Sequence, residues 1–174
     1  MNMIMPYSTE DKTVAELSQR LALACGVDMP IAQMISEAAA IHDIGKSKIP
    51  RNIINKPSGL SPSERKIIKN HTIWGANMLL GVSGIVGAMS RDIALYHHEK
   101  YDGTGYWGKR SSELPFYVHI VTLCDVYVAL ISPRPYKDGW TKDKALEYIR
   151  TNAGKDFNPI LAQMFINLVR GERP

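Results

Sequence analysis

Hydrophobic positions along the chain recur at the three- and four-residue spacing of amphipathic helices, and no stretch shows the strict alternation of a half-buried strand. Helix-start and helix-stop residues divide this pattern into separate elements, such as Ser8 or Thr9 before the first stripe and Gly26 after it. The pattern predicts helices at residues 9–25, 30–44, 61–78, 85–98 and 116–131, and two more that begin near Thr141 and Asn158. The predicted fold class is therefore all-α, a bundle of about seven helices.

The segment from Glu99 to Leu114 interrupts the helical pattern. It is polar, holds three glycines and shows little apolar periodicity, so we expect a loop there. Loops of this length in compact domains are often functional. A second irregular segment, the Pro-rich turn at residues 132–139, precedes the last two helices.

Composition restricts the class of protein. The chain has 174 residues, 45% of them hydrophobic and 22% charged, and no repeat or linker divides it, so we expect one domain over residues 1–174. No apolar run reaches the roughly 18 residues of a membrane span, and residues 1–10 lack the layout of a signal peptide. Cys25 and Cys124 lie in apolar helical stretches without CxxC or Cys/His spacing. These features predict a cytoplasmic protein that does not insert into a membrane.

The net charge of +4 is unevenly distributed, with acidic side chains prevailing in residues 1–45 and basic ones in the rest. Such a surplus attracts anionic ligands, but a solvated basic face explains it equally well. The basic residues are scattered and form no recognised DNA- or RNA-binding motif, so we do not expect a nucleic-acid partner.

Histidines and aspartates at helix ends and on inner stripes carry the candidate chemistry: His42, Asp43, His71, His97, His98 and Asp125. The surroundings of Asp125 are so apolar that its carboxylate would cost several kcal/mol unless it were paired or bound to a metal. Adjacent residues diverge by about 100° on a regular helix, but at a fraying helix end their side chains can converge. Each residue alone also fits a hydrogen-bonded core residue or a solvated helix end, whereas their joint occurrence favours a site for transition metals.

This joint pattern resembles the HD superfamily of metal-dependent phosphohydrolases, and more narrowly the HD-GYP domains that hydrolyse the bacterial messenger cyclic di-GMP. The similarity runs from about Val14 to Leu168. Its carriers include His42-Asp43-Ile44-Gly45-Lys46, His71-Thr72, Trp74-Gly75-Ala76, His97-His98-Glu99, Tyr101-Asp102-Gly103-Thr104-Gly105-Tyr106, Asp125-Val126-Tyr127 and Phe157-Asn158-Pro159. The resemblance implies an HD-domain helical bundle.

The resemblance also implies roles for individual residues. The metal ligands would be His42, Asp43, His71, His97, His98 and Asp125. Asp43 would bridge two divalent transition-metal ions, with iron or manganese expected and a third ion as an alternative. Lys46 would stabilise charge on the phosphate, and Arg134 and Lys137 would contact the substrate phosphates. Gly105 and Tyr106 match the loop that gives the family its name.

The sequence departs from the family pattern at three positions. Trp107 stands where the family has the proline of the GYP motif, and the stretch after it is short. Glu10 stands where many members have a metal-binding histidine, so it is a further candidate ligand. Val128 replaces a common aspartate, which removes a possible hydrogen bond to a ligand.

These features predict a metal-dependent phosphodiesterase that hydrolyses cyclic di-GMP through a metal-bridging hydroxide. One alternative is an HD phosphohydrolase that acts on another nucleotide or cyclic dinucleotide. Another is a non-catalytic module that docks onto a partner, such as a diguanylate cyclase, through residues 99–113. Because the sequence contains no sensor or receiver domain, an input signal would come from a partner of that kind or from the small molecule.

Overall fold

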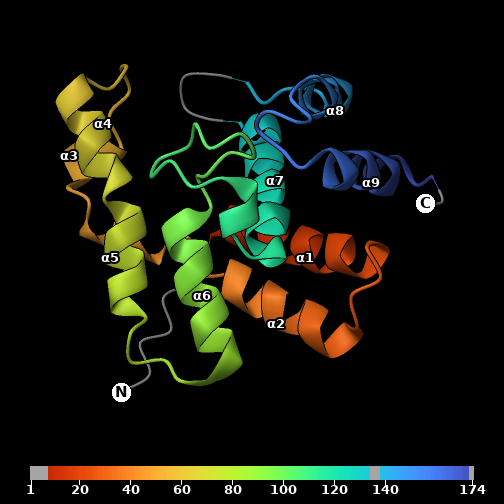
Figure 1. The fold of residues 1–174 in the computed structure, drawn as a ribbon. Coiled ribbons are helices and arrows are strands. Elements are labelled where there is room, and N and C mark those ends of the chain that lie inside the picture. The colour runs from red at the N-terminus through yellow and green to blue at the C-terminus, as the bar shows by residue number, and fades with distance from the viewer. Residues whose placement is uncertain (1–7, 134–137, 173–174) are drawn as a thin grey trace.

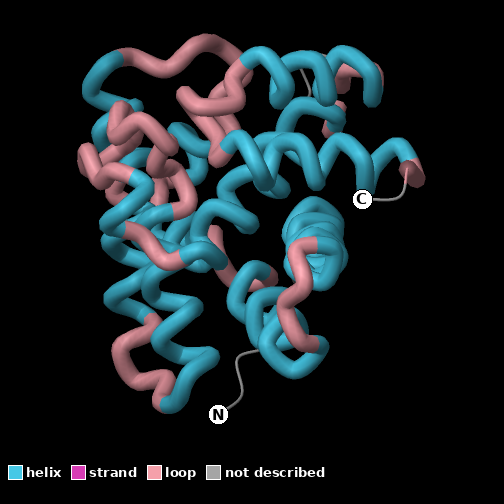
Figure 2. Tube along the Cα trace, turned by 45° about the vertical axis from the view of Figure 1, so that its right-hand side comes forward, coloured by secondary structure: helices cyan, strands magenta, loops and turns pink. Residues whose placement is uncertain are grey.

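The computed structural model describes residues 8–133 and 138–172. These residues form helices joined by loops, with no strand in the described ranges (Figure 2). The α-helices are α1 (Thr9–Ala24), α2 (Met29–Ala39), α3 (Arg51–Ile54), α4 (Pro62–Lys69), α5 (His71–Met78), α6 (Gly84–Tyr96), α7 (Phe116–Ile131), α8 (Lys142–Thr151) and α9 (Pro159–Arg170). Two 3-10 helices, η1 (Ile44–Lys48) and η2 (Ser111–Glu113), complete the set. The predicted all-α fold class is confirmed.

Helix α7 runs through the middle of the bundle, with α3, α4 and α5 on one side and α8 and α9 on the other (Figure 1). Helix α1 packs against α2, α7 and α9, while α6 packs against α2, α5 and α7. The largest fully buried apolar side chains come from six of these helices and are Leu21, Ile35, Ile93, Ile120, Leu123, Leu146, Ile149, Leu161 and Phe165. Burial of the apolar stripe of each helix therefore accounts for the packing of the bundle.

The helix predicted over 61–78 is two helices in the structure. Its start is as expected, since Ser61 and Glu64 form a capping box. The break comes at Asn70, whose backbone N–H bonds to the Ile67 carbonyl three residues back. At the same point His71 Nδ1 lies 2.6 Å from the carbonyl oxygen of Ile68, within hydrogen-bonding distance. A side chain competing for a backbone acceptor ends α4 and starts α5 in a new direction.

The second predicted helix also ends early, because α2 stops at Ala39 instead of continuing to residue 44. The chain then turns into η1 and the single turn α3, neither of which the hydrophobic pattern indicated. Gly45 makes this turn possible, since a Cβ there would lie 1.9 Å from the His71 carbonyl oxygen and 2.5 Å from the Gly75 nitrogen. Glycine thus lets η1 lie directly against the backbone of α5.

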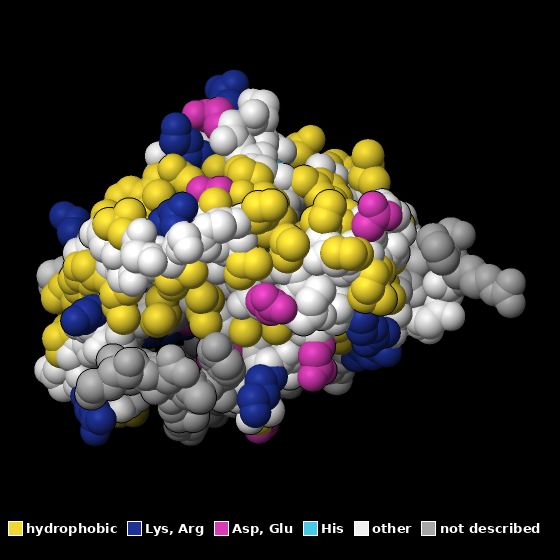
Figure 3. All heavy atoms as spheres, turned by 90° about the horizontal axis from the view of Figure 1, so that it is seen from below, with side chains coloured by type: hydrophobic (Ala, Val, Ile, Leu, Met, Phe, Trp, Pro, Cys, Tyr) yellow, Lys and Arg dark blue, Asp and Glu magenta, His cyan; other side chains and the backbone are white. Residues whose placement is uncertain are grey.

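The face of the molecule seen from below carries many hydrophobic side chains among separate charged ones (Figure 3). Exposed large apolar residues around the connection from α5 to α6 are Met78, Leu80, Val82 and Ile85. None of the described helices combines the length and apolar character that crossing a bilayer requires.

Candidate metal centre

Four separate segments bring the six candidate ligands together. His42 and Asp43 lie in the turn between α2 and η1, His71 is the first residue of α5, His97 and His98 follow the last residue of α6, and Asp125 lies within α7. Two overlapping groups have ligand atoms that all lie within 4.8 Å of one another. They are Asp43 with His71, His97 and His98, and His42 with His97 and Asp125.

Backbone carbonyls orient three of the imidazoles. The Nδ1 atoms of His42, His71 and His97 lie 2.8, 2.6 and 2.9 Å from the carbonyl oxygens of residues 39, 68 and 93. Each carbonyl is in the last turn of a helix, and those of residues 39 and 93 also accept the backbone N–H of His42 and His97. The Nε2 atoms are therefore left to face the centre, as in metal sites whose histidines are oriented by a second hydrogen bond.

Asp43 lies between the two groups of ligands. Its Oδ1 is 3.3 Å from His71 Nε2 and 3.6 Å from His97 Nε2, while its Oδ2 is 3.3 Å from His42 Nε2. His42 Nε2 is also 3.5 Å from Asp125 Oδ1. Asp43 Oδ1 and His42 Nε2 are buried without a hydrogen-bond partner. Buried polar atoms are rarely left this way, so the donor set fits divalent ions bound on both sides of Asp43.

Burial and neighbouring charges shift the pKa values of the residues in this cluster, upward for some and downward for others. Burial opposes protonation of His42, but the carboxylates of Asp43 and Asp125 outweigh it and raise the His42 pKa well above its ordinary value. Burial also opposes ionisation of both carboxyls, yet their contacts with His42 hold the pKa of each below its usual range. Burial lowers the pKa of His97 and, more strongly, of His98. Those two imidazoles are thus neutral and able to accept a metal ion at neutral pH.

Lys46, in η1, lies beside the same carboxylate, and its Nζ forms an ion pair with Asp43 Oδ2. Burial acts against the charged ammonium, but Asp43 more than compensates and raises the pKa of Lys46. Lys46 is therefore a permanent positive charge at the edge of the centre.

Asp11, one residue beyond the candidate Glu10, has a carboxylate near the cluster. Glu10 is exposed, whereas Asp11, His42 and Asp43 form a third group with ligand atoms within 4.8 Å. Consecutive helix residues point about 100° apart, so the one-residue offset decides which carboxylate faces the centre. The capping box between Ser8 and Asp11 is the sequence signal that could have placed Asp11 at this helix start.

The loop after α6 is held by a buried carboxylate that sequence reasoning had given no role. Glu99 is 2% exposed and accepts hydrogen bonds from the backbone N–H groups of Trp107 at 2.6 Å and Lys109 at 2.8 Å. Gly105 passes so close to Glu99 that a Cβ would lie 2.5 Å from its Cα. The loop thereby places the Tyr106 ring 4.5 Å from the His98 ring, at an interplanar angle of 32°.

Trp107, which replaces the family proline, ties this loop to α4 and α5. Its indole Nε1 donates to Thr72 Oγ1 at 3.2 Å, and the ammonium of Lys69 lies 4.4 Å from its ring centroid. The indole ring is thus held by a hydrogen bond and by a cation–π contact. Trp107 is 37% exposed, so its outer part remains on the surface.

The remaining candidates lie away from the cluster or beyond the described ranges. Val128 is 3% exposed and packs in the hydrophobic core. His119, on α7, has its Nε2 3.2 Å from Ser111 Oγ. Arg134 and Lys137, the candidate phosphate contacts, lie outside the described residues.

This helical fold and this arrangement of imidazoles and carboxylates define the class of protein to which the chain belongs. A family model described as "HD domain" matches residues 4–161, and the chain belongs to that family. The resemblance noted in the sequence is thus confirmed at the level of the HD superfamily.

Curated relatives are longer proteins. The chain is 34% identical over 174 residues to a "Cyclic di-GMP phosphodiesterase" of Thermotoga maritima, covering 97% of this chain and 47% of that protein. It is 38% identical over 135 residues to the "Cyclic di-GMP phosphodiesterase response regulator RpfG" of Xanthomonas campestris, covering 77% and 36%. It is also 34% identical over 154 residues to "3'3'-cGAMP-specific phosphodiesterase 2" of Vibrio cholerae, covering 88% and 30%. The chain thus spans less than half the length of each.

Solved structures share the fold. The HDG"Y"P protein Bd1817 from Bdellovibrio bacteriovorus superposes with a TM-score of 0.74 at 23% identity, over 93% of this chain and 52% of that one. The HD domain of L. monocytogenes phosphodiesterase PgpH in complex with cyclic-di-AMP superposes with a TM-score of 0.65 at 22% identity, over 93% and 87%. At these identities the likeness establishes the helical arrangement alone.

Proposed function

We propose that this domain is a metal-dependent phosphodiesterase that hydrolyses a cyclic dinucleotide, with cyclic di-GMP as its substrate. The observation that carries the proposal is the convergence of four imidazoles around Asp43, with Asp125 beside His42, from four segments of the chain. Relatives named for cyclic di-GMP hydrolysis support the choice of substrate. A cytoplasmic location follows from the same proposal, because the messenger is an intracellular one.

Divalent ions bound here would lower the pKa of a water molecule and neutralise charge on the scissile phosphate. The mixed nitrogen and oxygen donors suit iron or manganese, two ions about Asp43 and a third near Asp11. Lys46 would add a fixed positive charge beside the non-bridging phosphate oxygens, where charge accumulates as the bond breaks. Arg134 and Lys137 remain the proposed contacts for the second phosphate, for which an arginine fork is well suited.

Turnover of cyclic di-GMP tests this function directly. The protein is reconstituted anaerobically with ferrous iron or manganese, and guanine-nucleotide products are separated by chromatography. We expect a linear dinucleotide or GMP from the wild type and no product from Asp43→Ala, which would also lose bound metal because Asp43 lies in two of the three ligand groups. An active, metal-free Asp43→Ala protein would refute the mechanism.

A second candidate function is hydrolysis of a mixed guanine–adenine cyclic dinucleotide. The relative named for 3'3'-cGAMP supports it, as does the replacement of the GYP proline by Trp107 in the loop beside His98. A panel of cyclic di-GMP, 3'3'-cGAMP and cyclic di-AMP separates the candidates by their kcat/KM values. Full metal loading without turnover of any of them would favour the non-catalytic module, docked through residues 99–113 onto a diguanylate cyclase or a sensor or receiver protein.

A further inference from the structure

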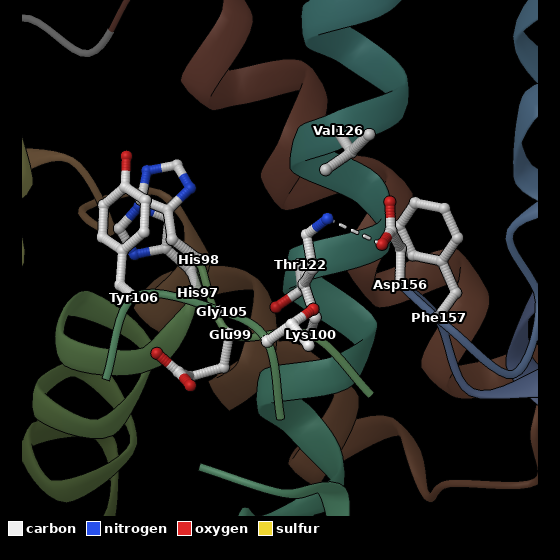
Figure 4. Close-up of a pocket in the computed structure, with 11 residues that line it drawn as sticks. His97, His98, Glu99, Lys100, Gly105, Tyr106, Thr122, Val126, Asp156 and Phe157 are labelled. Atoms are coloured by element: carbon white, nitrogen blue, oxygen red, sulfur yellow. Dashed lines mark ion pairs between the residues drawn. The ribbon is translucent and has the colours of Figure 1, made fainter. Parts of the chain in front are cut away.

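A half-enclosed pocket of about 240 Å³ adjoins the metal centre. It lies between the loop after α6, the side of α7 and the connection from α8 to α9 (Figure 4). His97 and His98 belong to the ligand cluster and also line this pocket. A molecule bound at the metal centre can therefore extend into the pocket. Its volume is below the roughly 300–1,000 Å³ of sites for drug-sized ligands, which suits one heterocyclic base better than a whole dinucleotide.

Ring faces and aliphatic groups form two walls of this pocket. On one side the Tyr106 ring lies against the His98 ring. On the other side lie Val126, on α7, and the Phe157 ring, which is seen next to Asp156 (Figure 4). Walls of this kind favour a flat aromatic ligand, because stacking on an aromatic side chain is worth about 1–3 kcal/mol per base.

Polar groups between these walls supply a hydrogen-bonding edge. Thr122 is only 7% exposed, and its Oγ1 is buried without a hydrogen-bond partner. Lys100 Nζ forms an ion pair with Asp156 Oδ1 at 2.8 Å, and the Tyr148 hydroxyl donates to Asp156 Oδ2 at 2.9 Å. The Thr122 hydroxyl is the unusual feature, since a buried hydroxyl normally finds a partner.

We propose that this pocket is a subsite for a purine base, specifically guanine, of the substrate whose phosphate lies at the metal centre. The inference rests on the proposed phosphodiesterase function and names the recognition that would make it guanine-selective. Guanine carries an acceptor, O6, next to two donors, N1–H and the N2 amino group. Lys100 beside Asp156 offers the complementary donor and carboxylate, and Thr122 can satisfy its hydroxyl on the base. Adenine reverses the order of donor and acceptor, so its N6 amino group would meet the Lys100 ammonium and its N1 lone pair the Asp156 carboxylate. Sites built for hydrogen bonding penalise such a mismatch strongly.

Two substitutions test the subsite by different routes. Asp156→Asn removes the carboxylate, and we expect the ratio of kcat/KM for cyclic di-GMP over cyclic di-AMP to fall at least tenfold. Thr122→Val keeps the side-chain shape but loses the hydroxyl, and we expect the KM for cyclic di-GMP to rise three- to tenfold relative to that for bis(4-nitrophenyl) phosphate, which has no purine. Thr151→Val is the matched control, because its hydroxyl bonds to the Glu147 carbonyl of its own helix and lies outside the pocket.

Calorimetric binding of GMP and AMP separates this inference from the proposed function. The metal-loaded wild type should bind GMP more tightly than AMP, and Asp156→Asn should abolish the difference. That result supports the subsite even if no cyclic dinucleotide is hydrolysed. Equal binding of GMP and AMP by the wild type, or unchanged kinetic ratios in both folded variants, would overturn the subsite while leaving phosphodiesterase activity intact. Thermal unfolding of Thr122→Val shows whether its effect has a structural origin.

Discussion

At the scale of single residues, His42 is the group whose protonation the cluster controls most directly. Its pKa is raised because burial is outweighed by two carboxylates, so the metal-free imidazole is protonated at neutral pH. A metal ion bound at Nε2 must displace that proton. We expect loading at pH 7 to release about one proton through His42. Titration calorimetry in two buffers with different ionisation enthalpies measures the number of protons released on metal binding. This number should fall by about one in His42→Asn. Equal proton release in both proteins would contradict this account.

Gly105 shows how a residue without a side chain positions others. A Cβ there would lie 2.5 Å from Glu99 Cα and 2.8 Å from the His98 carbonyl oxygen, so Gly105→Ala must displace the loop. We expect a loss of about 1–3 kcal/mol in the free energy of unfolding, as for other overpacking substitutions, with a higher KM for the dinucleotide. Denaturant unfolding and steady-state kinetics measure the two effects. Gly81→Ala is the control, because no atom lies within 4 Å of its added Cβ. Equal effects in both variants would exclude a steric cause.

The six candidate ligands could be proposed from sequence because they occur together at helix ends and in an apolar helix, and because their order along the chain resembles the HD superfamily. Glu99 was not given a role, because a carboxylate after two histidines carries no sign that the chain returns eight residues later to donate to it. Asp11 was missed for a different reason. Its distance from the centre depends on the exact rotation of α1, which a hydrophobic stripe defines only to within a residue.

At the scale of elements, the loop after α6 is held in part by the backbone N–H of Trp107. The proline of the family motif would lack this donor. Proline has no N–H, so Trp107→Pro removes the 2.6 Å hydrogen bond to buried Glu99 as well as the bond to Thr72. We expect this change toward the family motif to lower the free energy of unfolding by about 1–3 kcal/mol, the cost of an unsatisfied buried group.

Two milder variants separate the contacts of Trp107. Trp107→Phe keeps the backbone N–H and a ring for Lys69 but loses the indole bond to Thr72. Thr72→Val removes the acceptor of the indole and also the bond from the Thr72 hydroxyl to the Lys69 carbonyl. Trp107→Phe should cost about 1 kcal/mol, as for a single hydrogen bond, and Thr72→Val about 1–2 kcal/mol. Thermal or urea unfolding of the three proteins provides the comparison. A Trp107→Pro protein as stable as the wild type would show that the loop is held by other contacts.

Element boundaries followed the sequence where capping residues or proline defined them. Ser61 with Glu64 fixed the start of α4, and Asn158, whose side chain accepts from two backbone N–H groups, fixed the start of α9. The division at Asn70 and the early end of α2 were not predictable in the same way. Both depend on contacts between distant segments, the approach of Gly45 to α5 above all, and hydrophobic periodicity does not record such contacts.

At the scale of the whole molecule, the metal centre draws its ligands from elements that pack around α6. The turn after α2, the start of α5, the end of α6 and the middle of α7 each contribute ligands. Packing of α1 against α2 and α7 brings the apolar stripes together, whereas the ligands meet where several helix ends converge. Bound ions would therefore cross-link these segments and balance the two half-buried carboxylates, Asp43 and Asp125, that both lie within 3.5 Å of His42 Nε2.

Metal removal should for this reason destabilise the entire domain. An ion that binds only the folded state at about 100 times its Kd adds about 2.7 kcal/mol. For a chain of this size each kcal/mol shifts the Tm by about 2–4 °C, so chelation should lower the Tm of the wild type by roughly 5–10 °C. Scanning calorimetry with manganese and with a chelator measures the shift. Asp43→Ala should show little difference between the two conditions, because Asp43 contacts both groups of imidazoles. A wild-type Tm that is the same with and without the ion would mean that the cluster does not bind it in the folded state, and that protonated His42 and Lys46 balance the two carboxylates.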